Sequence, residues 1–307
     1  MRILFLFLDG VGLGVNDPSA NPFVNAKMPT LKKLLNGQPL IEAAAPCSSE
    51  RASLLALDAC LGVPGLPQSA TGQATLLTGR NIPAMLGYHY GPKPNPEVSE
   101  AMGQDTLFSR TVAAGQKAAL LNAYPPRYFQ GIESGLRIYS SIPLAVSRAG
   151  IRLCTQEDLT AGQALAADFT GQGWRRMLRI KDSPIMDEDT AGRKLCELSR
   201  EYDFSMFEYW ASDYAGHKQD MDKAVQVLEA FDSVLTSLVN SWKDEEGLIL
   251  ITSDHGNMED LSTRRHTYAK VPAIIIGDEK TRLRFTDGLT DIAGIAAACS
   301  RTLKLQS

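Results

Sequence analysis

The sequence lacks an excess of basic residues. Of its 307 residues, 31 are Lys or Arg and 35 are Asp or Glu, which gives a net charge of -4. A protein that binds duplex nucleic acid through counterion release needs a basic excess, so we expect no nucleic-acid partner. No apolar run approaches the ~20 residues that are needed to span a bilayer, so we expect no membrane partner either.

Cysteine is also scarce. The five cysteines are scattered and none has C-x-x-C spacing, which is typical of free thiols in a reducing compartment. The apolar run at residues 4–8 is too short for a signal peptide, Asp9 ends it, and no small-residue cleavage site follows. We therefore expect a cytoplasmic protein.

Several nucleotide-binding and hydrolase motifs are missing. There is no Walker A motif and no G-x-S-x-G elbow. The stretch Gly10-Val11-Gly12-Leu13-Gly14 has G-x-G-x-G spacing, and Asn-Asp-Pro follows it shortly afterwards where a dinucleotide-binding fold would begin a helix. A Rossmann-type cofactor site is therefore not expected.

Mostly apolar runs at residues 4–8, 204–209, 248–252 and 273–276 predict strands that are buried on both faces. Apolar residues at helical spacing predict a long helix over residues 221–238, and shorter helices are expected at 71–77 and 289–303. Strands of this kind separated by helices indicate an α/β fold.

The middle of the chain differs in composition from the two ends. Prolines crowd residues 88–97, a second break lies at residues 181–184, and between them seven arginines lie from residue 127 to residue 179. We interpret residues 85–185 as a small inserted cap domain. Residues 1–84 and 186–307 would then form the α/β core.

Acids and histidines follow these strands or lie just beyond them. The acids are Asp9, Asp213 and Asp254, and the histidines are His217, His255 and His266. Ligands of open α/β sheets bind beyond the carboxyl ends of the strands. Asp213 and His217 are four residues apart, which places them on one face of a helical turn. Carboxylates and imidazoles without thiolates suit Zn²⁺ or Mn²⁺.

A hydroxyl group begins the helix expected near residue 71. Ser69 could simply cap that helix. It could instead be a nucleophile, with the helix N-terminus stabilising the phosphate that it attacks. Spacing alone leaves both interpretations open, and it leaves the choice between Ser69 and Thr71 open as well.

Together these elements resemble the alkaline phosphatase superfamily, and within it cofactor-independent phosphoglycerate mutase and phosphopentomutase. The motifs that carry the resemblance are Phe-Leu-Asp-Gly-Val-Gly at residues 7–12, Ser-Ala-Thr-Gly at 69–72, Asp-Tyr-Ala-Gly-His at 213–217, Ser-Asp-His-Gly-Asn at 253–257 and His-Thr at 266–267. The resemblance implies an alkaline-phosphatase-like core, with a mostly parallel sheet between helices, in the two core segments.

The resemblance also implies roles for particular residues. One divalent ion, Mn²⁺ or Zn²⁺, would be held by Asp9, Ser69, Asp254 and His255, and a second by Asp213, His217 and His266. Ser69 aligns with the family nucleophile, whereas Gln73 stands where the family has His. The implied enzyme is a phosphatase or phosphomutase that acts through a phosphoserine intermediate.

The expected partner is a small phosphorylated metabolite. Arg127 is the best candidate to bind it, because Pro125 and Pro126 would stiffen its loop after the apolar residues 118–121. The short cap favours hydrolysis over isomerisation. A phosphodiesterase on the same core is an alternative. A catalytically idle protein that binds a phosphorylated ligand is disfavoured, because all seven core positions are present.

Overall fold

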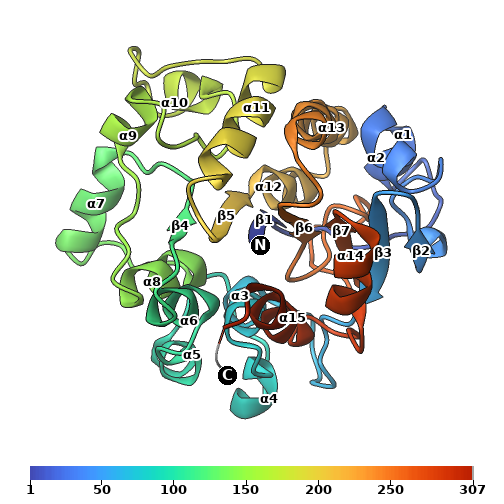
Figure 1. Ribbon diagram of the computed structural model, residues 1–307, viewed down its shortest axis with the longest axis horizontal. Helices are drawn as coiled ribbons and strands as arrows, with labels where there is room; N and C mark the ends of the chain where they lie inside the picture. Colours follow the sequence, from blue (N-terminus) through green and yellow to red (C-terminus); the bar gives the residue numbers. More distant parts are fainter. Residues whose placement is uncertain (306–307) are drawn as a thin grey trace.

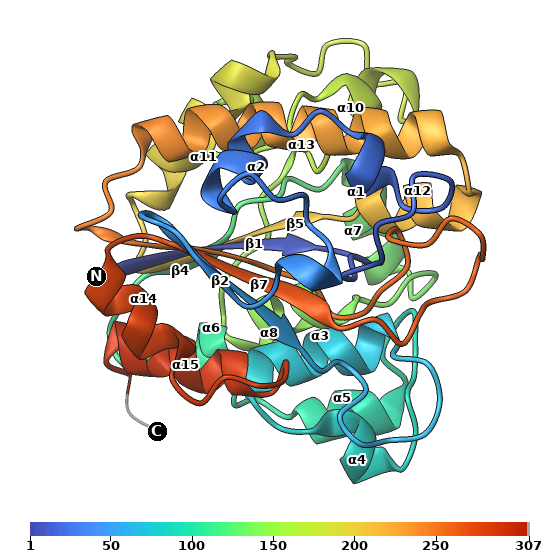
Figure 2. The ribbon, with the colours of Figure 1, turned by 90° about the vertical axis from the view of Figure 1, so that its right-hand side faces the viewer.

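The computed structural model describes residues 1–305, in which a seven-stranded sheet lies between two layers of helices (Figures 1 and 2). The order across the sheet is β2-β3-β7-β6-β1-β5-β4. The strands are β1 (Arg2–Leu8), β2 (Cys47–Ser48), β3 (Ala52–Leu57), β4 (Ala118–Leu120), β5 (Phe204–Tyr209), β6 (Gly247–Thr252) and β7 (Val271–Ile276). The expected α/β fold is confirmed.

The four apolar runs of the sequence form β1, β5, β6 and β7. β1 shows why such runs are apolar at every position: Leu4 and Leu6 enter the core on one face of the sheet, while Ile3 and Phe5 enter the core on the other. A strand that is covered on both faces needs apolar side chains on both.

The direction of each strand determines at which edge of the sheet β7 begins. β1 is parallel to β5 and β6, and β4 is parallel to β5. β7 runs antiparallel to both of its neighbours, β6 and β3. The residues that precede β7 therefore lie at the edge where β1, β5 and β6 end.

One helical layer is built on α13 (Met221–Ser241), against which the other helices of this layer pack. They are α1 (Pro22–Asn25), α2 (Pro29–Leu34), α11 (Glu188–Ser199) and α12 (Ala211–Lys218). The opposite layer contains α3 (Ser69–Thr78), α4 (Ile82–Leu86), α5 (Pro96–Met102), α6 (Leu107–Ala113), α8 (Ser141–Arg148), α14 (Glu279–Thr286) and α15 (Gly294–Leu303). Within residues 1–305, no helix has both the length and the apolar character to cross a membrane.

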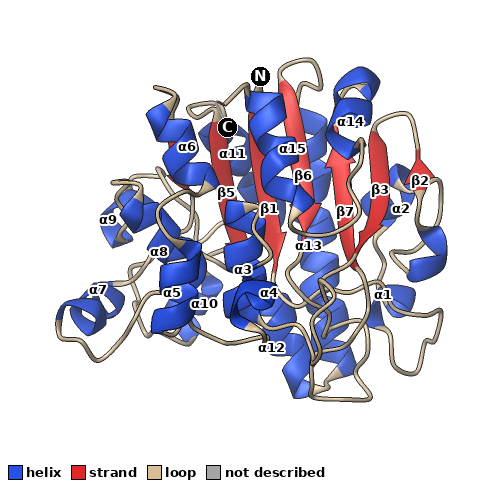
Figure 3. Cartoon of the chain, turned by 90° about the horizontal axis from the view of Figure 1, so that it is seen from below, coloured by secondary structure: helices blue, strands red, loops and turns tan. Residues whose placement is uncertain are grey.

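The region expected as a cap, residues 85–185, is not wholly separate from the core. β4 pairs with β5 at the edge of the main sheet, and α5, α6 and α8 pack in the layer of α3 and α15. The remaining helices are α7 (Pro126–Glu133), α9 (Gln156–Thr160) and α10 (Gln172–Arg176). α7 and α9 lie beyond β4 at the side of the molecule (Figure 1), and Figure 3 shows them at the same side, away from β7 and β3. Leu159 and Trp174 belong to a small apolar cluster of their own here. A boundary at residue 85 thus places a core strand and three core helices in the insertion. The sequence does not reveal this, because the β4–β5 pairing joins residues that are far apart in the chain.

Candidate metal centre

The predicted ligands meet at one edge of the sheet. Asp9 directly follows β1, Asp213 lies in the first turn of α12 after β5, and Asp254 and His255 follow β6. His266 precedes β7, so the reversed direction of that strand brings it to the same edge. Ser69 joins them from the start of α3.

The first group of side chains surrounds His255. Its Nε2 lies 3.0 Å from Ser69 Oγ, 3.5 Å from Asp9 Oδ1 and 3.6 Å from Asp254 Oδ1. Two ligands that each lie about 2.0–2.2 Å from a tetrahedral ion are roughly 3.4 Å apart. Ser69, Asp9 and Asp254 are therefore each at ligand spacing from His255.

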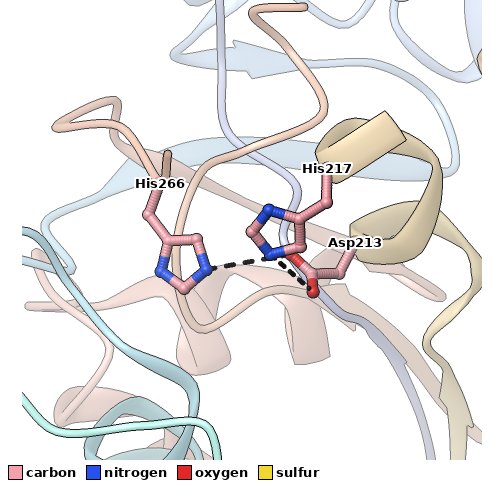
Figure 4. Close-up of side chains that lie close together, drawn as sticks. All are labelled: Asp213, His217 and His266. Carbon is pink, nitrogen blue, oxygen red and sulfur yellow. Dashed lines mark ion pairs between the residues drawn. The ribbon is translucent and has the colours of Figure 1, made fainter. Parts of the chain in front are cut away.

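The second group is formed by Asp213, His217 and His266 (Figure 4). His217 Nε2 lies 3.3 Å from Asp213 Oδ2, and His266 Nε2 lies 4.0 Å from Asp213 Oδ1. Asp213 and His217 share one face of α12, as their four-residue spacing predicts.

Hydrogen bonds on the far side of each ring orient the two histidines. His217 Nδ1 lies 2.7 Å from the carbonyl oxygen of Arg264, and His266 Nδ1 lies 2.7 Å from that of Pro67. Because a carbonyl oxygen only accepts, each Nδ1 carries the donated proton, and the Nε2 atom of each ring faces the cluster, where it can bind an ion once it is deprotonated.

Asp213 connects the two groups, because a carboxylate oxygen of it also lies within 4.8 Å of ligand atoms of Asp9 and His255. Asn257 Nδ2 donates a hydrogen bond of 2.6 Å to Asp213 Oδ1. The sequence motif contains Asn257 without indicating its role, and the structure gives it this orienting contact. Gly10 has a φ of +66°, and a Cβ there would lie 2.4 Å from Asp213 Oδ1, so the close approach requires glycine.

The electrostatics of the cluster call for added positive charge. Burial and the neighbouring Asp254 and Asp213 raise the pKa of Asp9 well above its usual value. Burial and Asp213 raise the pKa of Asp254 to about 8. Burial also opposes ionisation of Asp213, but hydrogen bonds from His217 and Asn257 lower its pKa to about 2.

Two observations show that these residues fit divalent ions. Within residues 1–305, the buried oxygens Asp9 Oδ1 and Asp254 Oδ2 have no hydrogen-bond donor. Burial and His266 lower the pKa of His255 to about 3, so this imidazole is neutral, as a metal ligand must be. Cations between the carboxylates would satisfy these oxygens and relieve the repulsion.

The structure separates Ser69 from Thr71. α3 begins at Ser69 and its N-cap residue is Gln68, so the Ser69 hydroxyl makes no cap and faces His255. The Thr71 hydroxyl donates to the carbonyl oxygen of Gln68 at 3.1 Å and lies against the backbone of Tyr90. Only Ser69 is thus brought to the cluster.

A cleft of about 930 Å³ opens over the cluster, and Asp9, Ser69, Gln73 and Asp213 line its base. Arg127 lines the cleft but lies in the first turn of α7, not in the loop that was expected, because Pro126 provides the first residue of that helix.

The other arginines of residues 127–179 mostly serve the protein itself. Arg137 lines the cleft with Arg127. Arg148 donates to the backbone of Ser99 and Gly103, and Arg152 forms an ion pair with Asp158. These two have structural partners, so Arg127 and Arg137 are the arginines that the cleft itself offers to a ligand.

Known proteins resemble this chain in sequence over part of its length and in fold over all of it. Residues 179–301 match the family model of the metalloenzyme superfamily. The PH0037 protein from Pyrococcus horikoshii has the same fold at 16% identity, with a TM-score of 0.58 over 100% of this chain and 97% of that one. Alkaline phosphatase from the Antarctic bacterium TAB5 matches at 14% identity and a TM-score of 0.53, over 100% of this chain and 99% of that one. The expected alkaline-phosphatase-like fold is confirmed.

The sequence match to curated proteins covers less of the chain than the fold match does. The 2,3-bisphosphoglycerate-independent phosphoglycerate mutase of Psychrobacter arcticus is 33% identical over 119 residues, which are 36% of this chain and 22% of that enzyme. The chain thus matches only about a fifth of the length of this curated relative. The metalloenzyme match and the two ligand clusters together support the use of divalent metal ions.

Proposed function

We propose that this protein is a two-metal phosphoryl-transfer enzyme, a phosphatase or phosphomutase, that uses Ser69 as its nucleophile. The observation that carries the proposal is the position of the Ser69 hydroxyl. It lies at the first residue of α3, 3.0 Å from His255, and it faces a cleft that also exposes Asp9 and Asp213.

Seven residues would hold the metals. Asp9, Ser69, Asp254 and His255 would bind one ion, and Asp213, His217 and His266 the other, with Mn²⁺ or Zn²⁺ suited to this donor set. When bound, such ions lower the pKa of the hydroxyl and neutralise the charge of the transferred group. Asn257 and the carbonyl oxygens of Pro67 and Arg264 would hold the side chains in their ligating orientation.

The chain's own residues supply the remaining chemistry. The Ser69 oxygen attacks phosphorus and forms a phosphoserine while the bond from phosphorus to the alcohol oxygen breaks. The Ser69 proton passes to solvent and the departing alcohol oxygen takes a proton from solvent, after which water hydrolyses the phosphoserine. The N-terminus of α3 carries partial positive charge, which stabilises the anionic group at Ser69. Arg127 would bind the outer part of a phosphorylated metabolite.

We favour hydrolysis over isomerisation, because a mutase must shield its phosphoserine from water. Only a small part of residues 85–185 stands clear of the core, and the cleft residues Trp210 and Tyr214 are 50% and 53% exposed. The cleft volume also accommodates a diester, which makes a phosphodiesterase the second candidate.

The test compares a generic aryl phosphate with its bis-ester in the presence of Mn²⁺ or Zn²⁺. A panel of phosphorylated metabolites then separates released phosphate from isomerised product. Ser69→Ala should abolish turnover with a stability loss of at most about 1–2 kcal/mol, because one hydroxyl is removed. Thr71→Val is the control and should keep activity. Activity in Ser69→Ala together with none in Thr71→Val would reverse the nucleophile assignment.

Absence of all turnover in the wild-type protein, together with tight binding of phosphorylated ligands, would instead support the catalytically idle alternative. Faster hydrolysis of the bis-ester than of the monoester would favour the phosphodiesterase. A clean isomerised product without released phosphate would overturn the preference for hydrolysis.

A further inference from the structure

Glu208 is a buried acid that the proposed chemistry does not use. It lies on β5 and pairs with Phe7 of the neighbouring strand β1. Phe7 comes two residues before Asp9 in the sequence. All six residues of β5 are buried, and Glu208 is the charged one, with 8% of its surface exposed. Its side chain lines the cleft together with Asp9 and Ser69.

The position of Glu208 is fixed from two sides. The Tyr124 hydroxyl donates a hydrogen bond of 2.7 Å to Glu208 Oε2. The Asn122 side chain donates to the backbone oxygen of Glu208 at 2.9 Å and accepts from its backbone N–H at 2.7 Å. The carboxyl group is therefore held in place at the inner wall of the cleft.

No charged partner compensates this burial. Within residues 1–305, no Lys, Arg or His forms an ion pair with Glu208, and burial raises its pKa to about 7 against the opposing effect of the Tyr124 hydrogen bond. A buried carboxyl group with one donor is costly, and such groups concentrate at functional sites. The second oxygen is free to accept a hydrogen bond from a ligand in the cleft.

The rest of the cleft indicates which donor this is. The rings of Tyr124 and Tyr128 have centroids 4.5 Å apart, with their planes inclined by 34°, and form an aromatic wall. Lys93, Arg127 and Arg137 also line the cleft, and none of them forms an ion pair within residues 1–305. These three positive charges would repel a ligand ammonium group, whereas they would not repel a neutral hydroxyl group.

We propose that Glu208 is a specificity-determining residue that accepts a hydrogen bond from a hydroxyl group on the alcohol part of the substrate. The substrate class is then phosphate esters whose alcohol carries at least one further hydroxyl group. This inference rests on the proposed function, because it takes the ester phosphate to lie at Ser69 and the alcohol to extend along the wall of Tyr124 and Tyr128.

The test uses pairs of esters that differ only in hydroxyl groups. Polyol phosphates of three to six carbons are compared with alkyl phosphates of the same chain length, and the preference is the ratio of their kcat/KM values. In the wild type the polyol ester should be preferred. Glu208→Ala should lower that preference about 10- to 100-fold, the effect of a lost hydrogen bond to a charged group. Glu208→Gln, which keeps the volume and one acceptor oxygen, should lower it less.

Glu133→Ala is the matched control, because Glu133 is an exposed acid on α7 that does not line the cleft. It should leave the preference unchanged. A preference in Glu208→Ala and Glu208→Gln within about twofold of the wild-type value would overturn the proposal.

Binding separates this proposal from the proposed function. The Kd values of the same ester pairs are measured by calorimetry on metal-loaded Ser69→Ala protein, with and without Glu208→Ala. If the wild type transfers no phosphoryl group but Glu208 still sets a preference in binding, the proposed function fails and the role of Glu208 stands. If turnover is present but neither kcat/KM nor Kd depends on the hydroxyl group, the role of Glu208 fails alone.

Discussion

Replacing Glu208 by Gln should stabilise the metal-free protein at pH 8 and have little effect near pH 4.5. The reason is the pKa of the buried carboxyl group, which burial raises from its ordinary value of 4.5 to about 7. Below pH 4.5 the group is protonated in both the folded and the unfolded chain, so folding carries no penalty. Between pH 4.5 and 7 the unfolded chain ionises first, and the folded state progressively loses stability.

The size of the effect follows from that interval. At 1.36 kcal/mol for each unit, the rise in pKa corresponds to a loss of about 3 kcal/mol above pH 7, as an upper value. Glutamine does not ionise, and its oxygen can still accept the Tyr124 hydrogen bond. The variant should therefore escape this loss, and its advantage in free energy of unfolding should grow from about zero near pH 4.5 to ~3 kcal/mol at pH 8.

The measurement is urea unfolding of both proteins at several pH values in the presence of a chelator, which removes stabilisation by bound metal. The acids and histidines of the metal centre titrate in both proteins, so their contribution largely cancels in the difference. The charge of Glu208 also helps to raise the pKa of Asp9, so its removal adds to the advantage of the variant at pH 8. The exposed Glu133→Gln change should show no such pH dependence. An unfolding free-energy difference that stays constant between pH 4.5 and 8 would refute the reasoning.

Three other changes test separate parts of the structure. Asp213→Asn should lower the metal content from two ions to at most one by elemental analysis, because Asp213 lies in both clusters. Gly72→Ala should cost about 1–3 kcal/mol in chemical unfolding and weaken metal binding, because its Cβ would lie 2.8 Å from Asp254 Cβ and 2.9 Å from the Asp254 carbonyl oxygen. Arg282→Met should cost about 2–4 kcal/mol in the same assay without changing metal content, because the buried guanidinium donates to three backbone carbonyl oxygens far from the cluster.

Much of the core could be predicted because its signals are local. The apolar runs that became β1, β5 and β6 are consecutive in sequence, and the long helix α13 repeats its apolar residues at helical spacing. Asp9 directly follows β1, Asp254 lies two residues after β6, and Asp213 lies four residues after β5. Predicting the strands therefore also predicted where the acids meet.

The parts that could not be predicted depend on pairing between distant residues. An apolar run looks the same whichever way its strand runs, so the reversal of β7 was invisible, as was the addition of β4 to the main sheet. Glu208 was missed although it left a signal. It is a charged residue inside an otherwise uncharged buried strand, and that exception to the pattern marks the cleft.

The place of β1 in the sheet has a consequence for how the protein is made. Ile3 pairs with Phe204 on one side and Leu248 on the other, so the central strand is synthesised long before either of its partners. Sheets built from such distant pairings fold slowly, and until then an unpaired apolar strand is open to aggregation or to chaperones. Asp9 reaches Asp213 and Asp254 only once that pairing is complete. Metal uptake is therefore a late event in the life of a new chain, and a metal-loaded protein is one whose central sheet has already closed.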